Sequence, residues 1–204
     1  MDSPTARPAP HGALNHVPPP AGAPAAHARV TLREIPRACV QFSGFGSGRD
    51  LAQWLRAEVG VAPAPNTVAA VLDGAACLAA IGPATWLMTG APGALDAIFA
   101  AGRETARPCA AVTDFSEGGR AFLELRGEPV AAVLGKYIDI DFDGGGLEPG
   151  HCASTAIHDT AVLVMRHRSD LFEIAVHRSF ASSLAQTLLD AAAEFGATIG
   201  GTGQ

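Results

Sequence analysis

Residues 171–196 read LFEIAVHRSFASSLAQTLLDAAAEFG. The first six place the β-prone side chains of Phe172, Ile174 and Val176 at alternate positions. Successive side chains of a strand point to opposite faces, so this alternation predicts a strand with one face on a core.

The rest of this stretch predicts an amphipathic helix. Ser179 is a candidate N-cap, because its hydroxyl can accept a hydrogen bond from a backbone amide of the first turn. Apolar side chains then recur at steps of four, three and four, the spacing of one helical face. They are Leu184, Leu188, Ala191 and Phe195. Gly196 is expected to end the helix.

The composition describes a chain of 204 residues, enough for one or two domains with a buried core. Hydrophobic residues make up 48% and charged residues only 17%, and the net charge is -6. A nucleic-acid partner is disfavoured, because phosphate backbones require a concentrated basic surface. High apolar content with low charge is typical of a protein that buries surface in a complex, and equally of a well-packed monomer.

The cysteines indicate a reducing compartment. They are Cys39, Cys77, Cys109 and Cys152, and no two form a CxxC motif. We interpret them as reduced core residues. The chain has no basic segment followed by an apolar run and no stretch of about 20 apolar residues. We therefore expect a soluble, cytoplasmic protein without a membrane span.

The chain divides by composition into an arm and a folded part. Residues 1–28 are rich in Pro and Ala, which excludes a helix or a central strand. This Pro/Ala-rich segment is either a disordered tail or an extended arm laid over a partner. Residues 29–106 form a first α+β half, residues 107–198 a second α+β half, and residues 199–204 a flexible tail.

The two halves repeat one pattern. Each reads strand, helix, two or three antiparallel strands and helix. The first half has predicted strands at 30–42 (with a possible break at Pro36), 68–72, 76–81 and 85–89, and predicted helices at 50–59 and 92–102. The second has predicted strands at 109–115, 121–125, 154–158, 161–165 and 171–176, and a helix at 128–137 before the final one. The predicted fold class is α+β, with two split-βαβ (ferredoxin-like) halves packed as one unit.

Two glycine-containing motifs do not fit cofactor sites. Residues 44–49, GFGSGR, lack the third glycine of a dinucleotide-binding loop and do not belong to a parallel crossover, so they are interpreted as a helix entry. Residues 139–144, DIDFDG, match the first six positions of a calcium loop. Position twelve of that loop must be glutamate and is Gly150 here, so an acidic surface loop is the better interpretation.

The histidines do not form a metal-binding pattern either. His151 and Cys152 are adjacent, whereas two ligands on one helix face lie three or four residues apart. Three further histidines follow or end predicted strands and are interpreted as exposed, with convergence on one side of the sheet as the alternative. These are His158, His167 and His177. The remaining ones, His11, His16 and His27, lie in the arm without a scaffold.

Candidate nucleophiles and acids lack the setting that catalysis needs. Thr113, Ser116 and Ser179 are not in a nucleophile-elbow motif. Asp114, Ser116 and Glu117 are expected to form a turn between the two halves, because sequence neighbours in a turn rarely face one another across a substrate. The sequence therefore predicts no catalytic, cofactor-binding or metal-binding residue in this chain.

Several short segments together carry a family resemblance. They are AVTDFS at 111–116, RAFLEL at 120–125 with Gly127, IDID at 138–141 with EPG at 148–150, VHRSFASSL at 176–184 with AEFG at 193–196, and GPATWL at 82–87. They resemble the gamma subunits of heterotetrameric sarcosine oxidases. The similarity covers about residues 30–196, and its C-terminal segment is the most specific part.

This resemblance implies a fold similar to the folate-binding domain of the glycine-cleavage aminomethyltransferase. It also implies a complex that demethylates sarcosine to glycine with FAD, FMN, NAD, zinc and tetrahydrofolate, all held by other subunits. The gamma chain would bind no cofactor and would contact mainly the alpha subunit, within a heterotetramer that also contains beta and delta subunits. Related N-methylglutamate dehydrogenases have a similar small subunit, so the amine oxidised by the complex is not determined by this chain.

Two hypotheses about the function follow, one of a structural subunit and one of a ligand-binding protein. The chain is either a non-catalytic assembly subunit of the oxidase or a stand-alone folate-binding protein that kept the pocket of its fold.

Overall fold

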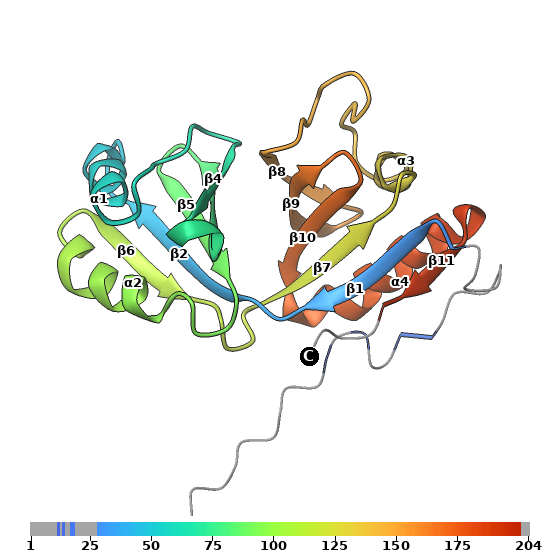
Figure 1. Ribbon diagram of the computed structural model, residues 1–204, viewed down its shortest axis with the longest axis horizontal. Coiled ribbons are helices and arrows are strands. Elements are labelled where there is room, and N and C mark those ends of the chain that lie inside the picture. The colour runs from blue at the N-terminus through green and yellow to red at the C-terminus, as the bar shows by residue number, and fades with distance from the viewer. Residues whose placement is uncertain (1–11, 13, 15–16, 19–27, 201–204) are drawn as a thin grey trace, which may run out of the picture.

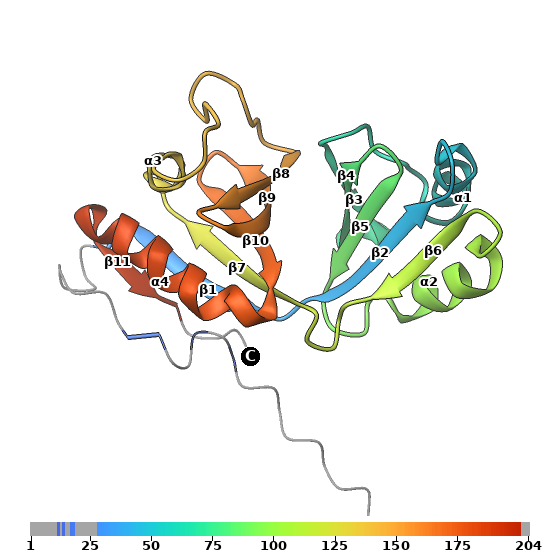
Figure 2. The same cartoon turned by 180° about the vertical axis from the view of Figure 1, so that it is seen from behind.

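The computed structural model describes residues 12, 14, 17, 18 and 28–200. This part of the chain forms two halves, each a sheet with helices on its outer side (Figure 1). The view from behind shows the two sheets side by side (Figure 2). The structure confirms the predicted α+β class.

The first sheet is five-stranded and antiparallel. It contains β2 (Ala38–Gly44), β3 (Val68–Val71), β4 (Ala76–Gly82), β5 (Thr85–Gly90) and β6 (Ala110–Asp114), in the order β3-β4-β5-β2-β6. Its outer face is covered by α1 (Arg49–Val59) and α2 (Asp96–Ala101). Leu51 and Leu55 of α1 join Phe42 and Met88 of the sheet in one hydrophobic cluster.

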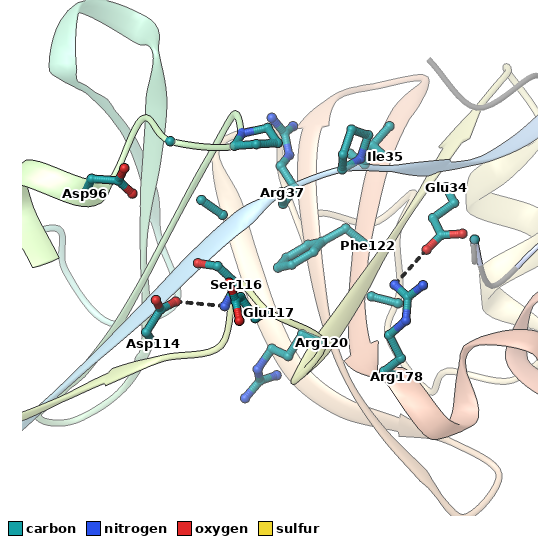
Figure 3. Close-up of a pocket in the computed structure, with 16 residues that line it drawn as sticks. Glu34, Ile35, Arg37, Asp96, Asp114, Ser116, Glu117, Arg120, Phe122 and Arg178 are labelled. Carbon is teal, nitrogen blue, oxygen red and sulfur yellow. Dashed lines mark hydrogen bonds and ion pairs between the residues drawn. The ribbon is translucent and has the colours of Figure 1, made fainter. Parts of the chain in front are cut away.

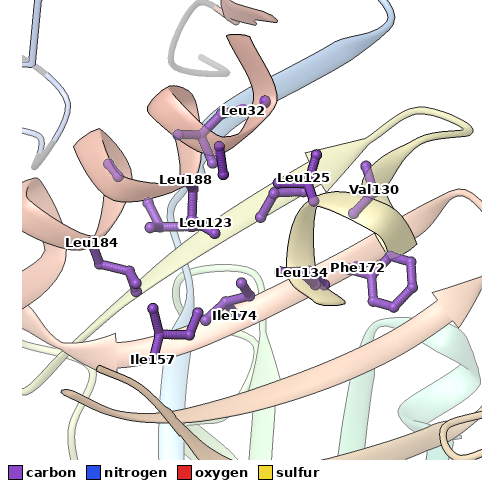
Figure 4. Packing of buried hydrophobic residues seen from close by; sticks show 14 of the residues in the cluster. Leu32, Leu123, Leu125, Val130, Leu134, Ile157, Phe172, Ile174, Leu184 and Leu188 are labelled. Carbon is purple, nitrogen blue, oxygen red and sulfur yellow. The ribbon is translucent and has the colours of Figure 1, made fainter. Parts of the chain in front are cut away.

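The second sheet is six-stranded. It contains β1 (Val30–Ile35), β7 (Arg120–Arg126), β8 (His151–Ile157), β9 (Thr160–Arg168), β10 (Leu171–His177) and β11 (Ala197–Ile199), in the order β11-β1-β7-β10-β9-β8. Only the β1–β11 pair is parallel. Helices α3 (Val130–Gly135) and α4 (Ala181–Ala192) cover its outer face. Leu184 and Leu188 of α4 pack there with Leu123 and Ile174 (Figure 4).

The chain crosses between the two sheets twice. The strand predicted at 30–42 is broken at Pro36 and Arg37, so that β1 lies in the six-stranded sheet and β2 in the five-stranded one. Proline lacks the N–H that a continuous strand would need there. The chain crosses again between β6 and β7. Sheet membership therefore does not follow the predicted boundary between residues 106 and 107.

The inner faces of the sheets pack on one another. Cys39, Ala79 and Leu87 of the five-stranded sheet form one cluster with residues of the six-stranded sheet that include Phe122 and Ala175. The strand at 171–176 was predicted to have one face on a core, and the structure buries both of its faces. The outward face of β10 is covered by helices, and its inward face is covered by the other sheet.

A second connection joins the halves on the side opposite the crossovers. The Val68 amide donates to the Gly150 carbonyl at 2.7 Å, and the Cys152 amide donates to the Asn66 carbonyl at 2.8 Å. Thr67 and His151 form an isolated antiparallel bridge between these bonds. Backbone hydrogen bonds thus tie the start of edge strand β3 to edge strand β8, which also covers two strand edges.

The start of α4 differs from the prediction. Ser179 is exposed in a 3-10 turn, Arg178–Phe180, and α4 begins at Ala181 with no side-chain cap. Gly196 does end the helical region, with a positive φ of 72°. The chain then forms β11 beside β1, a strand that the sequence pattern did not predict. Residue 199, predicted as the start of the tail, belongs to this strand.

Three smaller expectations need adjustment. The β3–β4 connection is longer than the expected two-residue turn at Asp73-Gly74, because Leu72 also adopts a left-handed φ of 53°. Helix α2 begins at Asp96, four residues after Pro92, and it continues past Gly102 as a π-helical segment, Gly102–Ala106. In the part of the chain that is described, no helix has the length and hydrophobicity required to cross a membrane.

Most of the predicted arm at 1–28 lies outside the described residues, including His11, His16 and His27. Leu14 is described and is only 6% exposed. It belongs to the cluster beneath the six-stranded sheet, and its amide donates to Glu34 at 3.4 Å.

Candidate functional site

The glycines of the GFGSGR segment are explained by packing. Gly48 is left-handed, with φ 69°, and directly precedes α1. A side chain at Gly48 would collide with Ala84, and one at Gly44 would press against the Ala84 carbonyl. These glycines let the β2–α1 connection pass close to the β4–β5 turn, so the segment is a helix entry, as the sequence predicted.

The DIDFDG segment lies in the long loop between α3 and β8. Asp141 accepts a hydrogen bond from the Gly144 amide at 2.7 Å, and its own carbonyl accepts one from the Gly146 amide at 2.7 Å. The loop is closed on itself by these bonds. In residues 28–200 and the four described arm positions, no group of three His, Cys, Asp or Glu side chains is placed to hold a metal ion.

The structure does not bring the three strand-end histidines together. His158 is in the β8–β9 turn with its ring centroid 4.8 Å from that of Tyr137. His177 is exposed at the end of β10. His167 is near the other end of β9, roughly 23 Å along the strand from the turn at 3.3 Å per residue. Among these histidines only His167 contacts a carboxylate, that of Glu173 at 3.3 Å.

All four cysteines are free thiols. Cys39 and Cys152 are buried, and Cys77 and Cys109 are partly buried. Burial raises the pKa of Cys39 to about 12 and that of Cys152 to about 11. It also raises the pKa of Cys77 and Cys109. A cysteine nucleophile acts as the thiolate, so these thiols are poorly suited to attack a substrate at neutral pH.

A buried ionic cluster lies on the inner face of the six-stranded sheet. Its centre is Glu173, only 2% exposed, which accepts hydrogen bonds from Arg37 at 2.8 and 3.3 Å and faces His167 at 3.3 Å. Burial by itself would raise the pKa of Glu173, but the bonds with His167 and Arg37 outweigh it and hold that pKa below its usual value. The cluster joins β9, β10 and the first crossover.

Two further ion pairs connect distant segments. Arg33 of β1 makes a two-pronged bond to Glu124 of β7, at 2.7 and 3.1 Å. Arg178 donates to Glu34 at 3.0 Å, which links the turn before α4 to β1. These acids are 9% and 7% exposed, so the charges would be costly to bury without their arginines.

A cavity of about 650 Å³ lies where the two crossovers meet, and we call it the waist cavity (Figure 3). Its charged lining residues are Glu34, Arg37, Asp96, Asp114, Glu117, Arg120 and Arg178. The predicted turn cluster lies here: Asp114 accepts from the Ser116 amide at 2.8 Å, and the Ser116 hydroxyl accepts from the Cys39 amide at 2.8 Å. These bonds hold the turn between the two sheets, as the sequence predicted.

Sequence reasoning missed the buried ionic cluster and the waist cavity. Glu173 seemed to lie on the water-facing side of its strand, because nothing local to residues 171–176 shows that a second sheet covers that side. A weak signal was available in Arg37, a charged residue beside the proline that breaks the predicted strand at 30–42.

Comparisons with known proteins agree with this architecture. The model of the sarcosine oxidase, gamma subunit family matches residues 51–194. No match was found among curated protein sequences.

Two solved structures share the fold. One is a chain of the heterotetrameric sarcosine oxidase from Corynebacterium sp. U-96, with a TM-score of 0.71 and 23% identity over 91% of this chain and 96% of that one. The other is the glycine cleavage system aminomethyltransferase T from Bartonella henselae, with a TM-score of 0.62 and 20% identity over 85% of this chain and 49% of that one. Because the family model spans well over half of the sequence, the chain belongs to the sarcosine oxidase gamma subunit family.

Proposed function

We propose that this chain is a non-catalytic assembly subunit of a heterotetrameric sarcosine oxidase complex. The complex demethylates sarcosine oxidatively to glycine, forms hydrogen peroxide and transfers the one-carbon unit to tetrahydrofolate. FAD, FMN, NAD, zinc and tetrahydrofolate are held by the other subunits. The chain contacts mainly the alpha subunit, beside beta and delta subunits, in the cytoplasm and without nucleic acid or membrane.

The observation that carries this proposal is the internal use of the chain's buried charges. A general acid or base must reach the substrate and have a pKa near the working pH. Glu173 is enclosed, its pKa is lowered, and it is bonded to Arg37 and His167. Glu34 and Glu124 are likewise bonded to arginines of other segments. Groups arranged in this way stabilise the packing of the strands, which fits a structural subunit better than a catalytic one.

The family and the fold support the partner assignment. The family is defined by a subunit of sarcosine oxidase, and a chain of a heterotetrameric sarcosine oxidase has the same fold over nearly its whole length. The same small-subunit role in a related N-methylglutamate dehydrogenase complex is the alternative within this class.

A stand-alone folate-binding protein is the second candidate, and the observation in its favour is the fold shared with an aminomethyltransferase. This chain corresponds to about half of that enzyme, 49% of its length. The likeness to that enzyme is one of fold, at 20% identity, so we place this candidate second.

Coexpression with alpha, beta and delta subunits separates the two candidates. With an affinity tag on the alpha subunit, we expect this chain to copurify in the same molar amount as the alpha, beta and delta subunits. The chain purified alone is expected to show no visible flavin absorption and no stabilisation by tetrahydrofolate. A solitary monomer that stays out of the complex and is stabilised by tetrahydrofolate would contradict the assembly role.

A further inference from the structure

One arginine of the waist cavity has no hydrogen-bond acceptor among the described residues. Arg120 is the first residue of β7, and its guanidinium carbon lies 5.5 Å from the centre of the Phe115 ring. Its Nε is buried and has no hydrogen-bond partner in the described part of the chain. A buried donor without an acceptor costs stability. Arg120 as a whole is only partly buried and forms no ion pair with the described residues, so its guanidinium group can receive an acceptor from outside.

The other two arginines of the cavity have acceptors within the chain. Arg37 donates to Glu173 at 2.8 Å, and Arg178 donates to Glu34 at 3.0 Å. The need for an oxygen acceptor is therefore concentrated at Arg120. A carboxylate meets this need best, because it can accept two parallel hydrogen bonds from a guanidinium group.

The surroundings favour a carboxylate that is part of a protein. Asp96 and Asp114 line the cavity and are exposed to water. They repel a small free anion, as does the net charge of -6. A carboxylate on a docked protein segment is held in place by the contacts around it. Phe180 offers such a contact: it is 49% exposed and lies in the same single turn as Arg178 of the cavity lining.

We propose that the waist cavity receives an Asp or Glu side chain of a partner subunit, whose carboxylate binds Arg120 and whose apolar neighbours cover Phe180. This inference rests on the proposed function, because it names the surface by which the chain joins its complex. Arginine and aromatic residues are the side chains enriched at the energetic centres of such interfaces.

The test compares Arg120→Met and Arg120→Lys with Arg126→Met in the coexpressed complex. Arg126 is at the other end of the same strand, and its side chain is 52% exposed. Loss of the charged hydrogen bonds is expected to lower the affinity of the Arg120→Met chain for the complex about tenfold or more. Arg120→Lys keeps the charge, so its affinity for the complex is expected to lie between those of Arg120→Met and wild type. Arg126→Met is expected to assemble like wild type.

The free full-length chain provides a second readout. Arg120→Met removes a buried donor that has no acceptor among the described residues, and the methionine side chain can still pack on the Phe115 ring. Its urea midpoint is therefore expected to equal or exceed that of wild type. Weaker assembly with unchanged or higher stability is the combination that identifies a docking residue.

Three outcomes would overturn the inference. One is an Arg120→Met chain that assembles as well as wild type while wild type joins the complex normally. Another is a parallel loss of assembly and of the free chain's stability, which would make Arg120 a structural residue. The third is stabilisation of the free chain by potassium acetate that depends on Arg120, with assembly unaffected. Failure of the wild-type chain itself to join the complex would instead refute the proposed function.

Discussion

Glu173 shows how the surroundings of a buried charge depend on residues from other segments of the chain. It is 2% exposed, and its acceptor oxygens are bonded to Arg37 and His167, which come from other segments. Removing one partner of a buried ion pair is costly because the other charge stays behind without compensation. Arg37 is partly exposed, so water can soften this cost.

Glu173→Gln is therefore expected to lower the free energy of unfolding by about 2–3 kcal/mol, measured by urea denaturation. Glu128→Gln is the matched control, because Glu128 also pairs with an arginine but is 84% exposed. We expect this control to cost less than about 1 kcal/mol. Equal effects of the two substitutions would show that the buried pair does not hold the strands together.

The lowered pKa of Glu173 also predicts a pH dependence. Its ordinary pKa is 4.5, and the folded state holds it below that value. The unfolded chain then binds the proton more readily, so the stabilisation is complete above the ordinary pKa and is lost as the pH falls through the folded one. Urea midpoints measured from pH 6 to about pH 3 should fall more steeply for wild type than for Glu173→Gln. Identical slopes would contradict the lowered pKa.

At the scale of elements, the sequence was informative wherever a local pattern determines structure. The alternation at 171–176 and the helical spacing of Leu184 and Leu188 predicted β10 and α4. The burial of Glu173 was not predictable, because the cover comes from a sheet made of other segments. The three-residue strand β11 was missed because its formation depends on β1, more than 160 positions earlier in the chain.

The turn from β7 into α3 makes a sharp test of backbone geometry. Gly127 has φ 140°, and a side chain there would overlap the carbonyl oxygen of Arg29, the residue before β1. We expect Gly127→Ala to cost about 3 kcal/mol or more, from strain and collision together. Gly118 also has a positive φ, 92°, but has open space around it. Gly118→Ala should cost only about 1 kcal/mol, and equal losses in thermal unfolding would exclude the predicted collision.

At the scale of the molecule, we expect the two halves to unfold together. They share two crossovers, an inner hydrophobic cluster and backbone bonds between β3 and β8. Both tryptophans, Trp54 and Trp86, belong to the half with the five-stranded sheet. Their fluorescence therefore reports on that half, whereas far-UV circular dichroism reports on both.

Leu188→Ala tests this coupling from the other half. Leu188 is 1% exposed in the cluster beneath the six-stranded sheet, so the substitution should cost about 2–5 kcal/mol. If unfolding is cooperative, the tryptophan transition and the circular dichroism transition shift by the same amount. A tryptophan transition that stays at the wild-type midpoint would show that the halves unfold independently.

The most direct test of the assembly role compares complexes made with and without this chain. The quantities measured are the yield of assembled complex and the sarcosine turnover per bound flavin in the purified assembly. We expect omission of the chain to reduce the yield strongly. We also expect assemblies that contain Glu173→Gln or His177→Gln chains to keep turnover within about twofold of wild type. Full assembly without the chain, combined with lost turnover that the wild-type chain restores, would contradict a non-catalytic assembly role.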